Sequence, residues 1–260
     1  MGHARLYKLP NTKPWRRVVG HLADGATVGV VAGATTKAAA RGLQLALGDK
    51  GMAHVLYLLA HTVMAARGAD FEGGLAGVGV IVPGDPSVFD LTAGFSGACD
   101  AWHSEHRNPR SDLADLAELS ATEALTRLVG DRSGQVIPTG DAVRNALYTL
   151  STKNGFATLA HEYFATFARR FLHYHLDREL SHHTGGNGRF ADRSARNSFA
   201  EDLAVHCREA ALIVRDYAGD WYSKANFEDG ISEKRARQFS RVCLGKLRDE
   251  LLVRGEVARV

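Results

Sequence analysis

Cysteine is scarce in this sequence, with three residues in 260. Cys99, Cys207 and Cys243 are far apart and odd in number, which excludes a disulfide framework and favours a reducing compartment. Long apolar runs are also missing. The most apolar stretch, residues 52–66, is shorter than the roughly 20 apolar residues that a membrane-spanning helix needs. Because residues 1–17 also lack the apolar core of a signal peptide, we expect a cytoplasmic protein that makes no contact with a membrane.

A large excess of charge of one sign is absent as well. The chain has 32 Lys and Arg against 29 Asp and Glu, which gives a net charge of +3. A protein that binds nucleic acid over its whole surface usually carries more positive charge, so only a local basic patch stays open. The apolar fraction of 45% and the charged fraction of 23% are typical of an ordinary globular protein. Abundant Ala, Arg and Gly indicate a bacterial origin.

The spacing of apolar residues predicts an all-α, or nearly all-α, fold with a long central helix. Two short runs, residues 26–32 and 78–82, are the candidates for a small two-stranded element. We expect one helical domain over residues 1–260. The alternative is an irregular amino-terminal half, 1–110, followed by a helical bundle, 111–260. The predicted helices are residues 35–47, 52–67, 111–129, 141–150, 156–180, 197–217 and 232–254, whereas Gly94 and Gly97 weaken any helix in 87–107.

Residues 156–180 form the longest periodic segment and are predicted to be the central helix. At 100° per residue, one face of this helix carries Phe156, Ala160, Tyr163, Phe164, Phe167, Phe171 and Tyr174. The leucines at 172, 176 and 180 make a second apolar stripe on the opposite side. The pattern therefore predicts a helix that is covered on two sides.

One cluster has residue types that suit a metal. Cys99, His103 and His106 recur at i, i+4 and i+7, which would place them on one face if this segment is helical. Thiolate and imidazole are preferred zinc ligands, and three of them leave a fourth position open for catalysis. The alternative is a histidine-rich amphipathic helix without metal. No other cofactor is indicated.

A second cluster lies in the predicted central helix. The spacing from Arg169 or Arg170 to His175 satisfies the pattern Arg-x(4 to 6)-His, and it resembles the ribonuclease motif of the HEPN families of helical nucleases. The resemblance covers seven residues and implies that arginine and histidine act together on the 2′-hydroxyl and the scissile phosphate of RNA. In a continuous helix, however, Arg170 and His175 lie roughly 140° apart. The alternative is a basic pair that extends from a packed helix to solvent.

The last predicted helix, residues 232–254, is basic and amphipathic. Such a helix could contact phosphates or a partner protein; the alternative is a solvated outer face. The basic residues with this candidate role are Lys234, Arg235, Arg237, Arg241, Lys246 and Arg248.

No motif in the chain identifies a reaction, so the leading hypothesis is a non-catalytic helical subunit or adaptor. We expect it to work with other protein subunits in an intracellular bacterial assembly, for which antiviral defence is one setting. Two alternatives stay open. The first is an enzyme, either a HEPN-like ribonuclease or a zinc-dependent enzyme. The second is a module that binds nucleic acid through the basic terminal helix.

Overall fold

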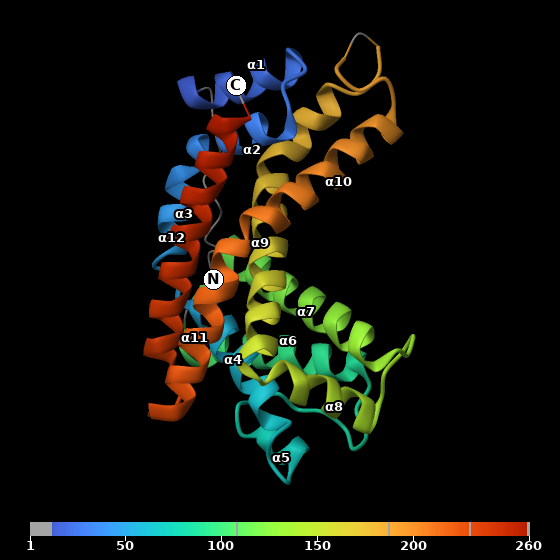
Figure 1. Ribbon diagram of the computed structural model, residues 1–260, viewed down its shortest axis with the longest axis vertical. Coiled ribbons are helices and arrows are strands. Elements are labelled where there is room, and N and C mark those ends of the chain that lie inside the picture. Colours follow the sequence, from blue (N-terminus) through green and yellow to red (C-terminus); the bar gives the residue numbers. More distant parts are fainter. Residues whose placement is uncertain (1–11, 108, 187, 229, 259–260) are drawn as a thin grey trace.

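The computed structural model describes residues 12–107, 109–186, 188–228 and 230–258 (Figure 1). Within these ranges the regular structure is helical, no strand is found, and the sheet-like contacts are two isolated bridges, Ser87 to Thr139 and Thr184 to Phe190. The predicted all-α fold with a long central helix is therefore confirmed. The helices are α1 Lys13–Ala23, α2 Val28–Ala38, α3 Ala40–Ala46, α4 Lys50–Ala65, α5 Phe71–Ala76, α6 Val88–Glu105, α7 Asp112–Ser133, α8 Gly140–Leu150, α9 Lys153–His182, α10 Arg193–Ala210, α11 Leu212–Glu228 and α12 Glu233–Val257.

The 30-residue helix α9 runs through the middle of the molecule (Figure 1). Helices α7, α10 and α11 pack against it, and α7 and α10 diverge from it on the same side. Its predicted apolar face is buried except for Tyr174, which is 48% exposed and whose hydroxyl donates to Asp112. The second stripe, Leu172, Leu176 and Leu180, is buried too. The prediction of a helix covered on two sides is confirmed.

The strand prediction for residues 26–32 is wrong, because these residues begin helix α2. Thr27 caps this helix by accepting a hydrogen bond from the Val30 N–H. A Cβ atom added to Gly33 would lie 2.7 Å from the Cα of Gly255, so the α2 and α12 backbones are in close contact there. Only helices with small residues at the crossing approach this closely, and that packing outweighs the β propensity of the valines.

The second strand prediction, residues 78–82, is also wrong. This segment is irregular, with Gly79 at a φ of +85°, and it lies against α6. A Cβ atom on Gly94 would come within 2.4 Å of the Ile81 carbonyl oxygen, so this glycine permits a close contact. We predicted that glycines would weaken a helix here, yet α6 forms. Its start is stabilised by a capping box in which Ser87 and Asp90 satisfy each other's backbone N–H groups.

Two further boundaries differ from the prediction. Residues 197–217 form parts of two helices, α10 and α11, which are separated at Ala211. The amino-terminal half, for which irregular structure was one alternative, contains helices α1 to α6. None of the described helices combines the length and the apolar character that a membrane span requires.

Candidate functional site

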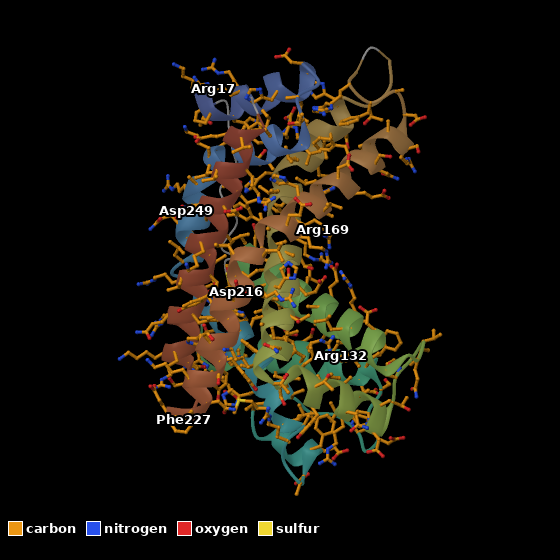
Figure 2. The ribbon with its side chains drawn as sticks, viewed as in Figure 1. Arg17, Arg132, Arg169, Asp216, Phe227 and Asp249 are labelled. Atoms are coloured by element: carbon orange, nitrogen blue, oxygen red, sulfur yellow. The ribbon has the colours of Figure 1, made fainter. Side chains whose placement is uncertain are left out.

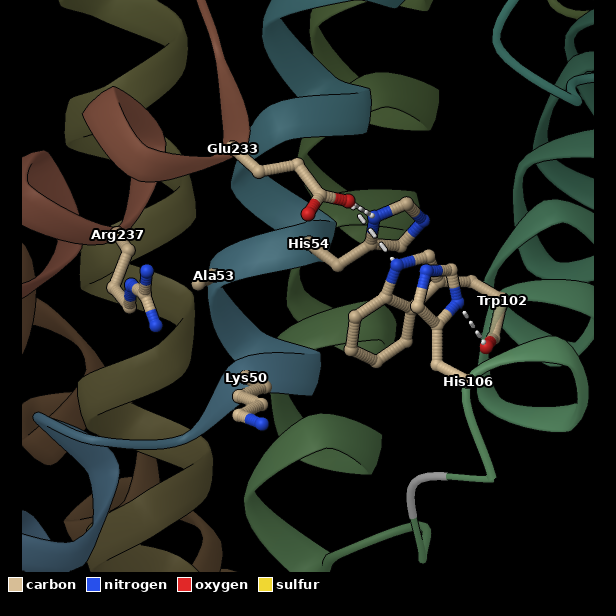
Figure 3. Close-up of a pocket in the computed structure, with 7 residues that line it drawn as sticks. All are labelled: Lys50, Ala53, His54, Trp102, His106, Glu233 and Arg237. Carbon is tan, nitrogen blue, oxygen red and sulfur yellow. Dashed lines mark hydrogen bonds and ion pairs between the residues drawn. The ribbon is translucent and has the colours of Figure 1, made fainter.

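A pocket of about 270 Å³ lies where the first turns of α4 and α12 meet the end of α6. Figure 3 shows the residues that line it: Lys50, Ala53, His54, Trp102, His106, Glu233 and Arg237. The three contributing helices are far apart in the sequence. The pocket is therefore a product of tertiary packing.

Glu233 organises one wall of the pocket. It lies in the first turn of α12, which Ser232 caps, and a carboxylate is favoured at this end of a helix dipole. Its Oε1 accepts a hydrogen bond from Trp102 Nε1 at 3.1 Å and lies 3.1 Å from His54 Nδ1. A second contact holds the same helices together, since His61 Nε2 is 2.8 Å from the Ile231 carbonyl oxygen.

His54 is uncharged at neutral pH. Burial lowers its pKa to about 4, the positive potentials of His103 and His106 act in the same direction, and Glu233 opposes the shift. Because an ionised carboxylate only accepts hydrogen bonds, the proton of the neutral ring is on Nδ1, the atom facing Glu233. Glu233 thereby fixes the tautomer and the orientation of the imidazole.

Three rings stack in the pocket. The indole of Trp102 lies between His54, at a centroid distance of 4.6 Å, and His106, at 4.8 Å. His106 is exposed, and its Nδ1 is 3.0 Å from the Trp102 carbonyl oxygen. Figure 3 shows His106 beside Trp102, and because His106 is exposed, a bound molecule can reach its ring.

Lys50 and Arg237 supply the positive charge of the pocket. Both are exposed, and neither forms a hydrogen bond or ion pair with another residue in the described part of the chain. Figure 3 shows them on the side of the pocket away from His106. Glu233 is the one acidic residue in the lining, so the cationic groups of Lys50 and Arg237 outnumber the anionic groups. The arrangement suits a ligand with an anionic oxygen group and an aromatic or apolar part.

The structure does not bring the predicted zinc ligands together. Cys99 is 2% exposed, and burial raises its pKa far above the ordinary value. His106 caps the end of α6 and is exposed, whereas His103 lies beside Gly51 of α4. Within the residues described, no group of three or more His, Cys, Asp and Glu side chains is arranged to hold a metal ion. The helix places the thiol in the core and His106 at the surface.

The ribonuclease-like residues have separate contacts. Arg169 Nη2 donates to both oxygens of Glu123, at 2.7 and 2.8 Å, and Arg170 Nη2 donates to Glu123 at 2.6 Å. The His175 ring packs edge-on against Phe171, and burial lowers its pKa to about 4. No hydrogen bond joins either arginine to His175 in the described structure.

Most basic residues of α12 act within the fold. Arg235 donates to the carbonyl oxygens of Ala225 and Gly230, Arg241 to the Leu47 carbonyl oxygen, and Arg248 to Asp249. Lys246 lies 5.8 Å from the Tyr217 ring centroid. Lys234 is exposed, and Arg237 lines the pocket. The helix is thus less available as a continuous basic surface than its sequence suggested.

Sequence reasoning missed most of the pocket. It named His106 and Arg237, but for other roles, and did not select Lys50, His54, Trp102 or Glu233. The pairs Lys50 and His54, and Trp102 and His106, are each four residues apart, which is a signal for a shared helix face. Glu233 is 179 residues from His54, and no local pattern indicates that the two meet.

Comparisons of the chain with models of known protein families, with curated proteins and with solved structures find no significant match.

Proposed function

We propose that this protein is a non-catalytic helical subunit that binds an oxyanion, a phosphate or carboxylate group, in the pocket between α4, α6 and α12. The observation that carries the proposal is the presence of two cations, Lys50 and Arg237, that have no partner in the described structure and line one cavity. Arginine and lysine bind phosphate and carboxylate through charge-assisted hydrogen bonds. The nearby stacked rings would contact the rest of the ligand.

The polar wall of the pocket gives the ligand an orientation. Glu233 already accepts hydrogen bonds from Trp102 and faces His54, and its side chain is still 52% exposed. One of its oxygens can therefore accept a hydrogen bond from a donor on the ligand. An anionic group would lie against Lys50 and Arg237, and a hydroxyl or amine would lie near Glu233.

The adaptor part of the proposal is supported by exposed apolar side chains. The Val88 N–H donates to the Pro138 carbonyl oxygen at 3.0 Å, which joins the start of α6 to the loop before α8. Near this junction Phe89, Val136 and Ile137 are 57%, 99% and 53% exposed. Grouped apolar residues of this kind are typical of surfaces that contact another protein. A bacterial assembly, with antiviral defence as one setting, stays a prediction from the sequence.

Ligand-dependent stabilisation tests the pocket. We expect inorganic phosphate, pyrophosphate or citrate to raise the melting temperature, because a ligand that binds only the folded state stabilises it by about 2.7 kcal/mol at 100 times its Kd. Arg237→Ala should abolish most of this shift. Lys234→Ala removes the same charge from the same helix outside the pocket and should keep it.

Equal shifts in both variants would show that the anions act by general screening, and the pocket proposal would then be wrong. The ribonuclease alternative is tested separately by incubation with a labelled RNA. Cleavage that depends on His175 would replace the non-catalytic proposal.

A further inference from the structure

Four arginines from three helices surround two glutamates on the side of α9 toward which α7 and α10 diverge. We call this group the arginine-rich face; it consists of Arg127, Arg169, Arg170, Arg208, Glu123 and Glu162. Glu162 accepts from Arg127 at 2.6 Å and from two nitrogens of Arg208 at 2.8 and 2.9 Å. Glu123 accepts from Arg169 and Arg170. Figure 2 shows Arg169 where α9 lies between the other two helices.

The two glutamates hold the arginines in place. The Glu162 side chain is 4% exposed, and although burial raises its pKa, Arg127 opposes that shift and favours the charged form. The arginine side chains themselves are 28–44% exposed. Each carboxylate therefore acts as a buried or half-buried anchor, and each guanidinium keeps part of its surface toward water.

Positive charge exceeds negative charge on this face. Four guanidinium groups face two carboxylates, and Asp131, which pairs with Arg127 at 3.8 Å, is a third acid, so the cations still outnumber the acids. Arg215 of α11 adds another cation to this region. Burial lowers the pKa of His161, and the nearby charges of Arg215 and Arg127 lower it further. Arg170 Nε is buried and has no partner in the described structure. That atom is out of reach of an external anion, but the exposed parts of the four guanidinium groups carry further N–H donors that a second anion would satisfy.

We propose that the arginine-rich face binds the phosphodiester backbone of a nucleic acid without reading its sequence. Guanidinium groups match phosphate geometry through paired hydrogen bonds, and the basic residues that hold Glu162 and Glu123 are all arginine. Residues 162 and 169 of α9 are about 10 Å apart along the helix axis, which corresponds to about three base-pair steps along the axis of a duplex. This proposal does not depend on the pocket.

Binding is measured by fluorescence anisotropy with a fluorescein-labelled (dT)20 strand and a labelled 20-base-pair duplex at several salt concentrations. Arg169→Gln with Arg170→Gln should weaken binding about tenfold and reduce the salt slope by about 0.7–0.9 per lost phosphate contact. Arg16→Gln with Arg17→Gln, an adjacent exposed pair on α1, makes the same charge change elsewhere and should change affinity less than about twofold.

The opposite change gives the sharper test. Glu123→Gln removes the anchor carboxylate of two arginines and should tighten binding several-fold, whereas a purely structural ion pair would give weaker binding or none. Glu256→Gln, which neutralises an exposed acid at the end of α12, is the matched control and should have little effect. Circular dichroism melts confirm that each variant is folded.

Three outcomes would overturn the proposal. One is no binding of either probe at low salt, and another is an equal effect of Glu123→Gln and Glu256→Gln. The third is displacement of the probes by poly-glutamate as effectively as by unlabelled (dT)20, because the face would then recognise an acidic protein.

Discussion

Helix α7 takes part in two charged clusters that have opposite compositions. Near its start, Arg110 donates to three carboxylates: Asp100, Asp115 and Glu118, the last at 2.5 Å. Nearer its other end, Glu123 and Arg127 belong to the arginine-rich face, where two carboxylates hold four arginines. Asp115 lies in the first turn of α7, where the helix dipole favours an acid, whereas Glu123 and Arg127 lie in the interior of the helix.

The two clusters differ in their net charge, and therefore in whether they can attract a further anion. Arg110 donates from Nε, Nη1 and Nη2 to three different acids, so this cluster has one cation for three carboxylates and a net negative charge. It closes the turn between α6 and α7, as a structural ion pair does. On the arginine-rich face four guanidinium groups surround two carboxylates, so cations are in excess there. Arginine and acidic residues thus form a structural contact between α6 and α7 in the Arg110 cluster, and a candidate anion-binding surface on the arginine-rich face.

The largest effect is expected in the core that both clusters border. Phe167 of α9 is 1% exposed and packs between Tyr163 and Phe171. Phe167→Ala should lower the free energy of unfolding by about 3–5 kcal/mol, measured by urea denaturation. A loss below about 1 kcal/mol would show that the aromatic face of α9 contributes little and that the ion pairs dominate.

Acid should destabilise the protein through its buried histidines. The folded-state pKa values of His54 and His175 are about 4 against 6.5 for the unfolded chain, so their contribution is complete above pH 6.5 and is lost as pH falls toward 4. We expect a loss on the order of 1–3 kcal/mol per histidine after allowance for partial exposure. Urea titrations of His175→Leu should show a flatter profile over this range. An unchanged profile would mean that His175 does not titrate as a buried group.

Removal of the anchor carboxylates should have unequal effects. Glu162→Gln removes the charged partner of Arg208 and leaves Arg127 with Asp131, 3.8 Å away, but the two arginines are 39% and 44% exposed and water can solvate them. We therefore expect a loss of about 1–3 kcal/mol at pH 7, less than for fully buried charges. The Glu123 side chain is 37% exposed, so Glu123→Gln should lower the free energy of unfolding by less than about 1 kcal/mol. Equal losses for the two variants would show that the buried Glu162 and the half-buried Glu123 stabilise the fold to the same extent, and this prediction would then be wrong.

At the Arg110 cluster the expected effect is smaller than in the core. Arg110→Met leaves three carboxylates together and should cost about 1–2 kcal/mol at pH 7. Burial raises the pKa of Glu118, so the folded state binds this proton more readily than the unfolded chain, and the loss should shrink as pH falls toward 4.5. A loss that grows on acidification would show that Glu118 is not the residue left unpaired.

The candidate sites were less predictable than the fold. The periodic segments at 52–67, 111–129 and 232–254 correspond to α4, α7 and α12 because their capping residues and apolar spacing are local signals. Arg169, Arg170 and His175 also attracted attention from their spacing. Glu123, the partner of the two arginines, lies on a different helix, and no sequence rule connects Glu123 with Arg169 and Arg170.

The sequence by itself determined that this chain is helical, that α9 is its central element, and which of its residues are buried there, because helix periodicity and burial are encoded within one or two turns. Tertiary structure alone decided that the valine-rich residues 28–32 are helical, since the close contact between Gly33 and Gly255 makes α2 pack against α12. It also decided both charged sites. His54 meets Glu233, and Arg208 meets Glu162, only after helices distant in the sequence have packed, because a side chain's charge partner depends on distance in space and not on separation along the chain.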